Sequence, residues 1–139
     1  MEGNSNPISP VVHVLVSEPF FWDKVESTLT ALGWAAFLPD WEGDVLAQLL
    51  ARDSLAVVVD LENDQVNAIE VLRAYLGSGK LDGSAVLAFA SHEKQDLLDK
   101  ARELGALAIV RSTFAASLVK VLQELCDPDP GNGGQAEAS

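Results

Sequence analysis

Short apolar segments alternate with longer amphipathic segments along the middle of the chain. The five apolar segments are rich in Val, Leu, Ile and Ala and bounded by turn residues; they are 11–16, 34–38, 55–59, 85–89 and 107–110. Continuous apolar runs of this length are typical of strands that are buried on both faces. The pattern therefore predicts five strands of a parallel sheet.

The segments that follow these runs repeat apolar residues with helical spacing. The five stripes are Phe21, Val25, Leu29 and Leu32; Val45, Leu46, Leu49 and Leu50; Ile69, Leu72 and Leu76; Leu97, Leu98, Ala101 and Leu104; and Phe114, Leu118, Val121, Leu122 and Leu125. Such stripes are typical of helices that cover a sheet. Gly33 and Gly105 are placed to end helices. Ser91 is placed to start the fourth helix, and Ser112 or Thr113 to cap the fifth.

The alternation predicts five βα units and hence an α/β fold, a three-layer sandwich with a five-stranded parallel sheet. We assign this domain to residues 10–126. Residues 1–9 are polar and are predicted to be a flexible segment. Residues 127–139 contain Asp, Pro and Gly but no large apolar side chain, so they are predicted to be a disordered tail.

Composition narrows the classes of function. The 139 residues fit one domain, and 21 acidic against 9 basic residues give a formal net charge of -12. This charge repels nucleic-acid phosphates and anionic lipid, and it favours divalent cations or a basic protein surface. We find no transmembrane run or secretory signal, and the single Cys126 excludes an internal disulfide. We therefore predict a cytoplasmic protein that binds neither nucleic acid nor membrane.

Polar residues that follow the apolar runs are the candidates for a functional site. Ligands of open parallel sheets bind at the carboxyl ends of the strands. Ser17 and Glu18 follow the first run, Asp60 follows the third, Ser91 follows the fourth and Arg111 follows the fifth. Carboxylates that converge at such an edge form a site of hard oxygen ligands that suits Mg²⁺.

The segment 55–61, Leu-Ala-Val-Val-Val-Asp-Leu, carries a resemblance to a known family. With the (βα)5 pattern of residues 10–126, it resembles the receiver domain of two-component response regulators, which has a flavodoxin-like fold. The resemblance implies that Asp60 is the candidate phosphoacceptor and that Glu18, Asp60 and the backbone of Glu62 would hold a metal ion. It also implies that Ala90, Ser91 and Arg111 stand at the positions that contact the phosphoryl group or switch the loop.

Several of these positions depart from the family's pattern. Ser17 replaces one of two acids, which weakens a Mg²⁺ site. Arg111 stands where the family has Lys, and a planar guanidinium does not replace a compact ammonium group. Ala90 lacks the switch hydroxyl, although the neighbouring Ser91 could supply one. Together these departures predict a degenerate receiver, or pseudo-receiver.

Simpler interpretations of the same residues stay open. Asp60 could end a strand and cap its loop through its side chain. Arg111 could pair with Asp60 as a structural salt bridge that imitates an occupied metal site. Trp41 lies between Asp40 and Glu42 in a predicted loop, so it is our candidate for an exposed anchor in a partner interface.

We therefore predict a stand-alone, receiver-like signalling module that is not an enzyme and acts through a protein partner, without efficient phosphorylation and with no required cofactor. The alternative is a working receiver, phosphorylated on Asp60 by a histidine kinase with Mg²⁺. A flavodoxin-like enzyme subunit or small-ligand binder is a third interpretation, which no sequence motif supports. The resemblance implies that the face shared by the fourth strand and fifth helix would meet a partner or form a homodimer.

Overall fold

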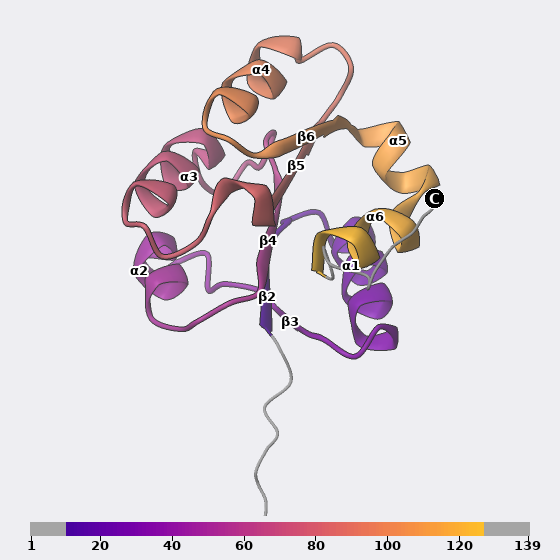
Figure 1. Ribbon diagram of the computed structural model, residues 1–139, viewed down its shortest axis with the longest axis horizontal. Helices are drawn as coiled ribbons and strands as arrows, with labels where there is room; N and C mark the ends of the chain where they lie inside the picture. The colour runs from indigo at the N-terminus through magenta and orange to yellow at the C-terminus, as the bar shows by residue number, and fades with distance from the viewer. Residues whose placement is uncertain (1–10, 127–139) are drawn as a thin grey trace, which may run out of the picture.

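Five parallel strands form one sheet in the order β3-β2-β4-β5-β6 (Figure 1). The computed structural model describes residues 11–126. Its strands are Val11–Leu15 (β2), Ala35–Phe37 (β3), Ala56–Asp60 (β4), Val86–Ala90 (β5) and Leu107–Val110 (β6). Every neighbouring pair is parallel, which confirms the predicted sheet. The predictions for residues 1–9 and 127–139 fall outside the described residues, so the predicted domain bounds stay a prediction.

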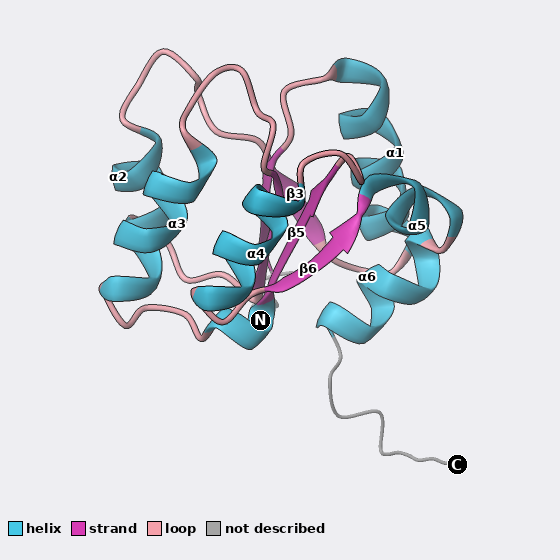
Figure 2. Ribbon diagram, turned by 90° about the horizontal axis from the view of Figure 1, so that it is seen from above, coloured by secondary structure: helices cyan, strands magenta, loops and turns pink. Residues whose placement is uncertain are grey.

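Helices cover both faces of this sheet. They are Pro19–Ala31 (α1), Val45–Leu50 (α2), Ala68–Gly77 (α3), Gln95–Glu103 (α4), Arg111–Ala116 (α5) and Leu118–Cys126 (α6), with a 3-10 turn at Gly83–Ala85 (η1). Figures 1 and 2 show α2, α3 and α4 on one face and α1, α5 and α6 on the other. This arrangement confirms the predicted three-layer α/β sandwich.

The core consists of two clusters, one on each face of the sheet. Along β4, Val57 packs toward α2, α3 and α4, whereas the next residue, Val58, packs toward α1 and α6. Because both faces are covered, successive residues of the strand are apolar. On the α1 side, Phe21, Phe89 and Phe114 pack together with ring centroids 4.7 to 5.5 Å apart.

The predicted helix ends are partly correct. Gly33 and Gly105 follow the last residues of α1 and α4 with φ of 94° and 95°, the left-handed conformation that glycine adopts without strain. The predicted start of the fourth helix at Ser91 is wrong, because α4 begins at Gln95. The Ser91 hydroxyl instead accepts a hydrogen bond from the Glu93 N–H within the preceding turn, at 3.2 Å.

The last predicted helix is two helices. The chain leaves helical geometry at Ser117, where φ is -124° and ψ is 32°. The break allows α5 to pack on β5 while α6 packs beside α1. Ser112 and Thr113 are not caps, because α5 already begins at Arg111 and they lie in its first turn.

The sheet brings the ends of β2 and β4 together. The chain passes from β2 to β3 on one side and then returns to place β4 on the other side of β2. Leu15, the last residue of β2, is in register with Val59 of β4. Such a reversal of strand order is where open α/β sheets form their crevices. The residues after these two strands therefore share one edge of the sheet.

Candidate functional site

A hollow of about 540 Å³ opens at this edge of the sheet. It contains four carboxylates and one guanidinium, together with two polar and two apolar side chains. The lining residues are Ser17, Glu18, Pro19, Phe21, Asp60, Glu62, Asp64, Gln65 and Arg111. The sheet thus brings together three site residues predicted from the sequence, namely Glu18, Asp60 and Arg111, and the side chain of Glu62.

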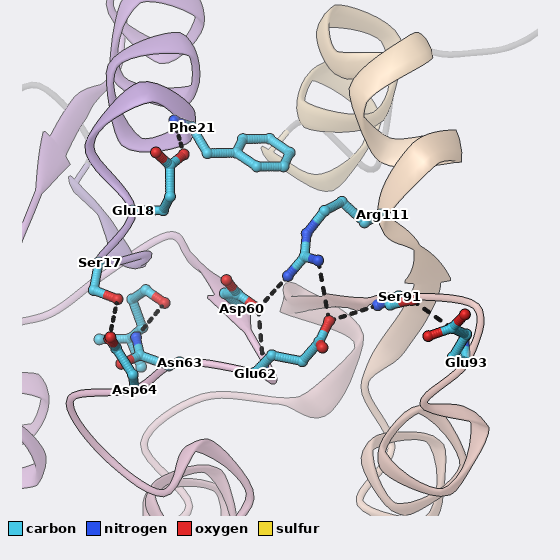
Figure 3. Close-up of polar contacts among 11 residues, drawn as sticks. Ser17, Glu18, Phe21, Asp60, Glu62, Asn63, Asp64, Ser91, Glu93 and Arg111 are labelled. Carbon is cyan, nitrogen blue, oxygen red and sulfur yellow. Dashed lines mark hydrogen bonds and ion pairs between the residues drawn. The ribbon is translucent and has the colours of Figure 1, made fainter.

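Asp60 is at the centre of this site (Figure 3). It is the last residue of β4, and only 7% of its surface is exposed. Its Oδ1 accepts hydrogen bonds from the Glu62 N–H and from Arg111 Nη2, both at 2.9 Å. Burial raises the pKa of the Asp60 carboxyl above its ordinary value, and these two donors oppose that shift. The carboxylate is therefore buried with both donors on the same oxygen.

Arg111 bridges two carboxylates. It is the first residue of α5, and its Nη2 lies 2.9 Å from Asp60 Oδ1 while its Nη1 lies 3.1 Å from Glu62 Oε2. Its guanidinium carbon lies 5.5 Å from the ring centroid of Phe89, within the range of a cation–π contact. The salt bridge between Arg111 and Asp60, one of the two interpretations of the sequence, is present in the structure.

Glu62 connects Arg111 to the loop after β5. Its Oε2 accepts a hydrogen bond from the Ser91 backbone N–H at 2.7 Å (Figure 3). We predicted Glu62 as a backbone ligand of a metal ion, and the pattern did not indicate this role of its side chain. Ala90, at the predicted switch position, is fully buried at the end of β5 and carries no hydroxyl group.

Glu18 is turned away from Asp60. Its two carboxylate oxygens accept hydrogen bonds from the Phe21 N–H at 2.8 Å and the Phe20 N–H at 3.2 Å, and so cap the start of α1. Among residues 11–126, no group of three or more His, Cys, Asp or Glu side chains is placed to hold a metal ion. In this conformation Glu18 and Asp60 do not fit a Mg²⁺ site, because one caps a helix and the other faces a guanidinium.

Two further residues of the site were missed by the sequence analysis. Asn63 Nδ2 donates to the Leu15 carbonyl at 3.0 Å, which ties the loop after β4 to the end of β2. Asp64 Oδ1 accepts from the Ser17 hydroxyl at 2.9 Å, a second link between the same two segments. The cluster of Asn and Asp after Asp60 was the available signal, but it does not specify partners 47 or 48 residues away.

Trp41 is not the exposed anchor that we expected. It lies in a turn, as predicted, but its side chain is only partly exposed and packs against the core cluster that contains Val45 and Leu49. The large apolar side chains that are exposed in the described part of the chain are Phe20, Leu107 and Val119. The helix α2 begins at Val45, and this residue is buried in the same cluster that Trp41 contacts.

No protein-family model and no curated protein matches this chain in sequence. Solved structures do match it. A response regulator from Thermotoga maritima superimposes with a TM-score of 0.67 at 14% identity, covering 86% of this chain and 99% of the other. The chemotaxis response regulator CheY4 of Vibrio cholerae gives a TM-score of 0.70 at 16% identity, covering 85% and 99%. A response regulator receiver protein from Burkholderia phymatum gives 0.65 at 20% identity, covering 85% and 95%.

This chain has the receiver fold. The strand order and the alternating helices agree with the flavodoxin-like architecture of these structures, so the predicted fold is confirmed. At these identities the likeness establishes the architecture, while the chemistry has to be argued from the side chains. No helix among residues 11–126 is both long and apolar enough to span a membrane.

Proposed function

We propose that this protein is an atypical receiver-like signalling module that acts by binding a protein partner and is not efficiently phosphorylated. The observation that carries the proposal is the 2.9 Å contact between Arg111 Nη2 and Asp60 Oδ1. The carboxylate that would attack a phosphorus atom is already paired with a cation of the same chain. A degenerate receiver, or pseudo-receiver, is therefore the interpretation that we favour.

The surroundings of Asp60 support the same proposal. Phosphoryl transfer depends on a cation that offsets charge on the transferred oxygens, and a metal ion usually supplies it. Here Glu18 caps α1, and the guanidinium of Arg111 is shared between Asp60 and Glu62. Ala90 has no hydroxyl that could follow a phosphoryl group. The contacts of Glu18 and Arg111 would have to change before a metal ion could take the place of the guanidinium beside Asp60.

A partner would bind the surface of this protein without prior phosphorylation of Asp60. Phe20, which follows Pro19 at the rim of the hollow, is 67% exposed and is our candidate contact. The net charge of -12 favours a partner with a basic surface. A second copy of the chain, docked on the face that carries the exposed Leu107, is the homodimeric variant of this proposal. The same proposal includes three further points: the protein is not an enzyme, it requires no cofactor, and it acts in the cytoplasm.

The alternative is a working receiver, and the hollow in front of Asp60 favours it. In that case an Asp60 oxygen would attack the phosphorus of a phosphohistidine on a kinase, and the P–N bond would break with its electron pair returning to the imidazole. Glu18, Asp60 and the backbone of Glu62 would hold Mg²⁺, and the ion would supply positive charge for the transfer. Arg111 would first have to leave Asp60 Oδ1, and Glu18 would have to release the N–H groups of α1.

An NMR titration of the backbone amides with Mg²⁺ and then with beryllofluoride, a phosphoryl mimic, separates these two functions. The proposal predicts no saturable shifts at residues 17–18, 60–62 and 111 in the wild type. Saturable shifts there that disappear in Asp60→Asn would overturn it and establish the working receiver. The Asp60→Asn variant is the matched control because it keeps the size of the side chain and removes its charge.

A further inference from the structure

A backbone N–H from the loop after β5 and a guanidinium from the start of α5 meet at one oxygen atom at the edge of the site, the first through a hydrogen bond and the second through an ion pair. Glu62 Oε2 accepts from the Ser91 backbone N–H at 2.7 Å and lies 3.1 Å from Arg111 Nη1 (Figure 3). Ser91 begins the loop between β5 and α4, and Arg111 begins α5. A backbone N–H and a guanidinium that point at one position form the elements of a site for an anionic oxygen.

We propose that these donors form an anion site that the protein fills with its own Glu62 side chain. The chain carries a net charge of -12, so free anions are repelled from its surface. A carboxylate attached two residues after the end of β4 avoids this cost, because the fold keeps its effective concentration at the site high. Glu62 is therefore a positioning residue that holds the β5–α4 loop and Arg111 in one arrangement.

The contact also borders a second hollow, which shares Arg111 with the first. A second hollow of about 320 Å³ is lined by Phe21, Ser91, His92, Val110, Arg111, Ser112 and Ala115. Both residues that Glu62 holds, Ser91 and Arg111, belong to its wall. This inference rests on the proposed function, to which it adds a cause: the loop beside Asp60 keeps one conformation because a carboxylate of the chain takes the place of an added anion.

Amide hydrogen exchange at Ser91 tests the inference. In Glu62→Ala we expect exchange of the Ser91 amide to accelerate about tenfold, because a hydrogen bond to a charged acceptor is lost. Glu62→Gln keeps an oxygen acceptor at the same reach and should retain most of the protection while the contact with Arg111 weakens. Glu70→Ala is the matched control, since it removes a carboxylate that pairs with Arg73 at 2.7 Å on the exposed side of α3.

Rescue by a small carboxylate distinguishes an anion site from a merely structural contact. Acetate added in large excess to Glu62→Ala, at an ionic strength that screens the net charge of the chain, should return the Ser91 amide shift toward its wild-type value, and it should leave Glu62→Gln and Glu70→Ala unchanged. Unchanged Ser91 exchange in Glu62→Ala, or an absence of rescue, would overturn the inference. Its failure is separable from that of the proposed function, which is judged on the wild-type response to Mg²⁺ and beryllofluoride.

Discussion

Asp60 and His13 are both buried ionisable side chains of this sheet, but their surroundings differ. Among residues 11–126 they are the buried polar or charged residues, with exposures of 7% and 0%. Asp60 ends β4 and receives the Glu62 N–H and the Arg111 guanidinium. His13 lies in the middle of β2, and neither of its ring nitrogens has a hydrogen-bond partner in the described part of the chain.

The difference shows where this fold can keep a charge. At the end of a strand, loops supply free N–H groups and charged side chains. In the middle of a parallel sheet the backbone donors are already used by neighbouring strands. The His13 ring instead meets the edge of Phe37, with centroids 5.5 Å apart. Burial, followed by the charge of Arg52, lowers the pKa of His13 to about 4, so the ring stays neutral at neutral pH.

The largest effect that we expect is the response of His13 to acid. The unfolded chain takes up this proton near pH 6.5, whereas the folded chain does so only at about 4. This group therefore costs no stability above pH 6.5, and it lowers the free energy of unfolding as the pH falls from 6.5 to about 4. The total loss is about 3 kcal/mol. Urea unfolding of wild type and His13→Leu across this range measures it; parallel pH curves for the two proteins would contradict the account.

The next effect concerns the partner that Asp60 has and His13 lacks. Arg111→Ala leaves Asp60 and Glu62 without their shared cation, and we expect the free energy of unfolding to fall by about 2 kcal/mol. Arg73→Ala removes an exposed pair with Glu70 and should cost less than about 0.5 kcal/mol. Urea denaturation of both variants compares them directly. Equal losses would mean that the Arg111 contacts are no more than surface pairs.

The smallest effect that we expect is the pKa shift of the Asp60 carboxyl, on which burial and pairing with Arg111 act in opposite directions. Burial outweighs the two donors, so the pKa of the Asp60 carboxyl is above its ordinary value of 3.8. The free energy of unfolding therefore contains a penalty for the buried charge at neutral pH, and acid relieves that penalty, opposite to the effect of His13. The carboxyl-carbon chemical shift of Asp60, followed against pH, gives the midpoint. A midpoint below 3.8 would show that Arg111 dominates over burial.

The fold was predictable from the sequence because a strand that is buried on both faces is a continuous run of apolar residues. The run 55–59 is continuously apolar since Val57 and Val58 point to opposite core clusters. The break at Ser117 was not predictable in the same way. Apolar spacing continues from Phe114 through Leu122, and both residues reach the same cluster, so the pattern is equally consistent with one helix or two.

The membership of the site was predictable, but its contacts were only partly so. Asp60 ends one strand of the parallel sheet and Arg111 follows another, so topology brings them to one edge. The role of Glu18 as a metal ligand stays a prediction. The sequence does not show that the free N–H groups of α1 compete for this carboxylate, and in the structure they bind it. The link from Glu62 to Ser91 spans 29 positions and depends on the shape of two loops, which periodicity does not specify.

A crystal structure of the wild type grown in excess Mg²⁺ tests the central claim most directly. The claim is that a guanidinium of the chain, and not a metal ion, neutralises Asp60. The account predicts Arg111 Nη2 in contact with Asp60 Oδ1 near the 2.9 Å found here, and no metal ion between Glu18 and Asp60. A Mg²⁺ ion bound to Asp60, with Glu18 turned away from α1 and Arg111 displaced, would contradict it.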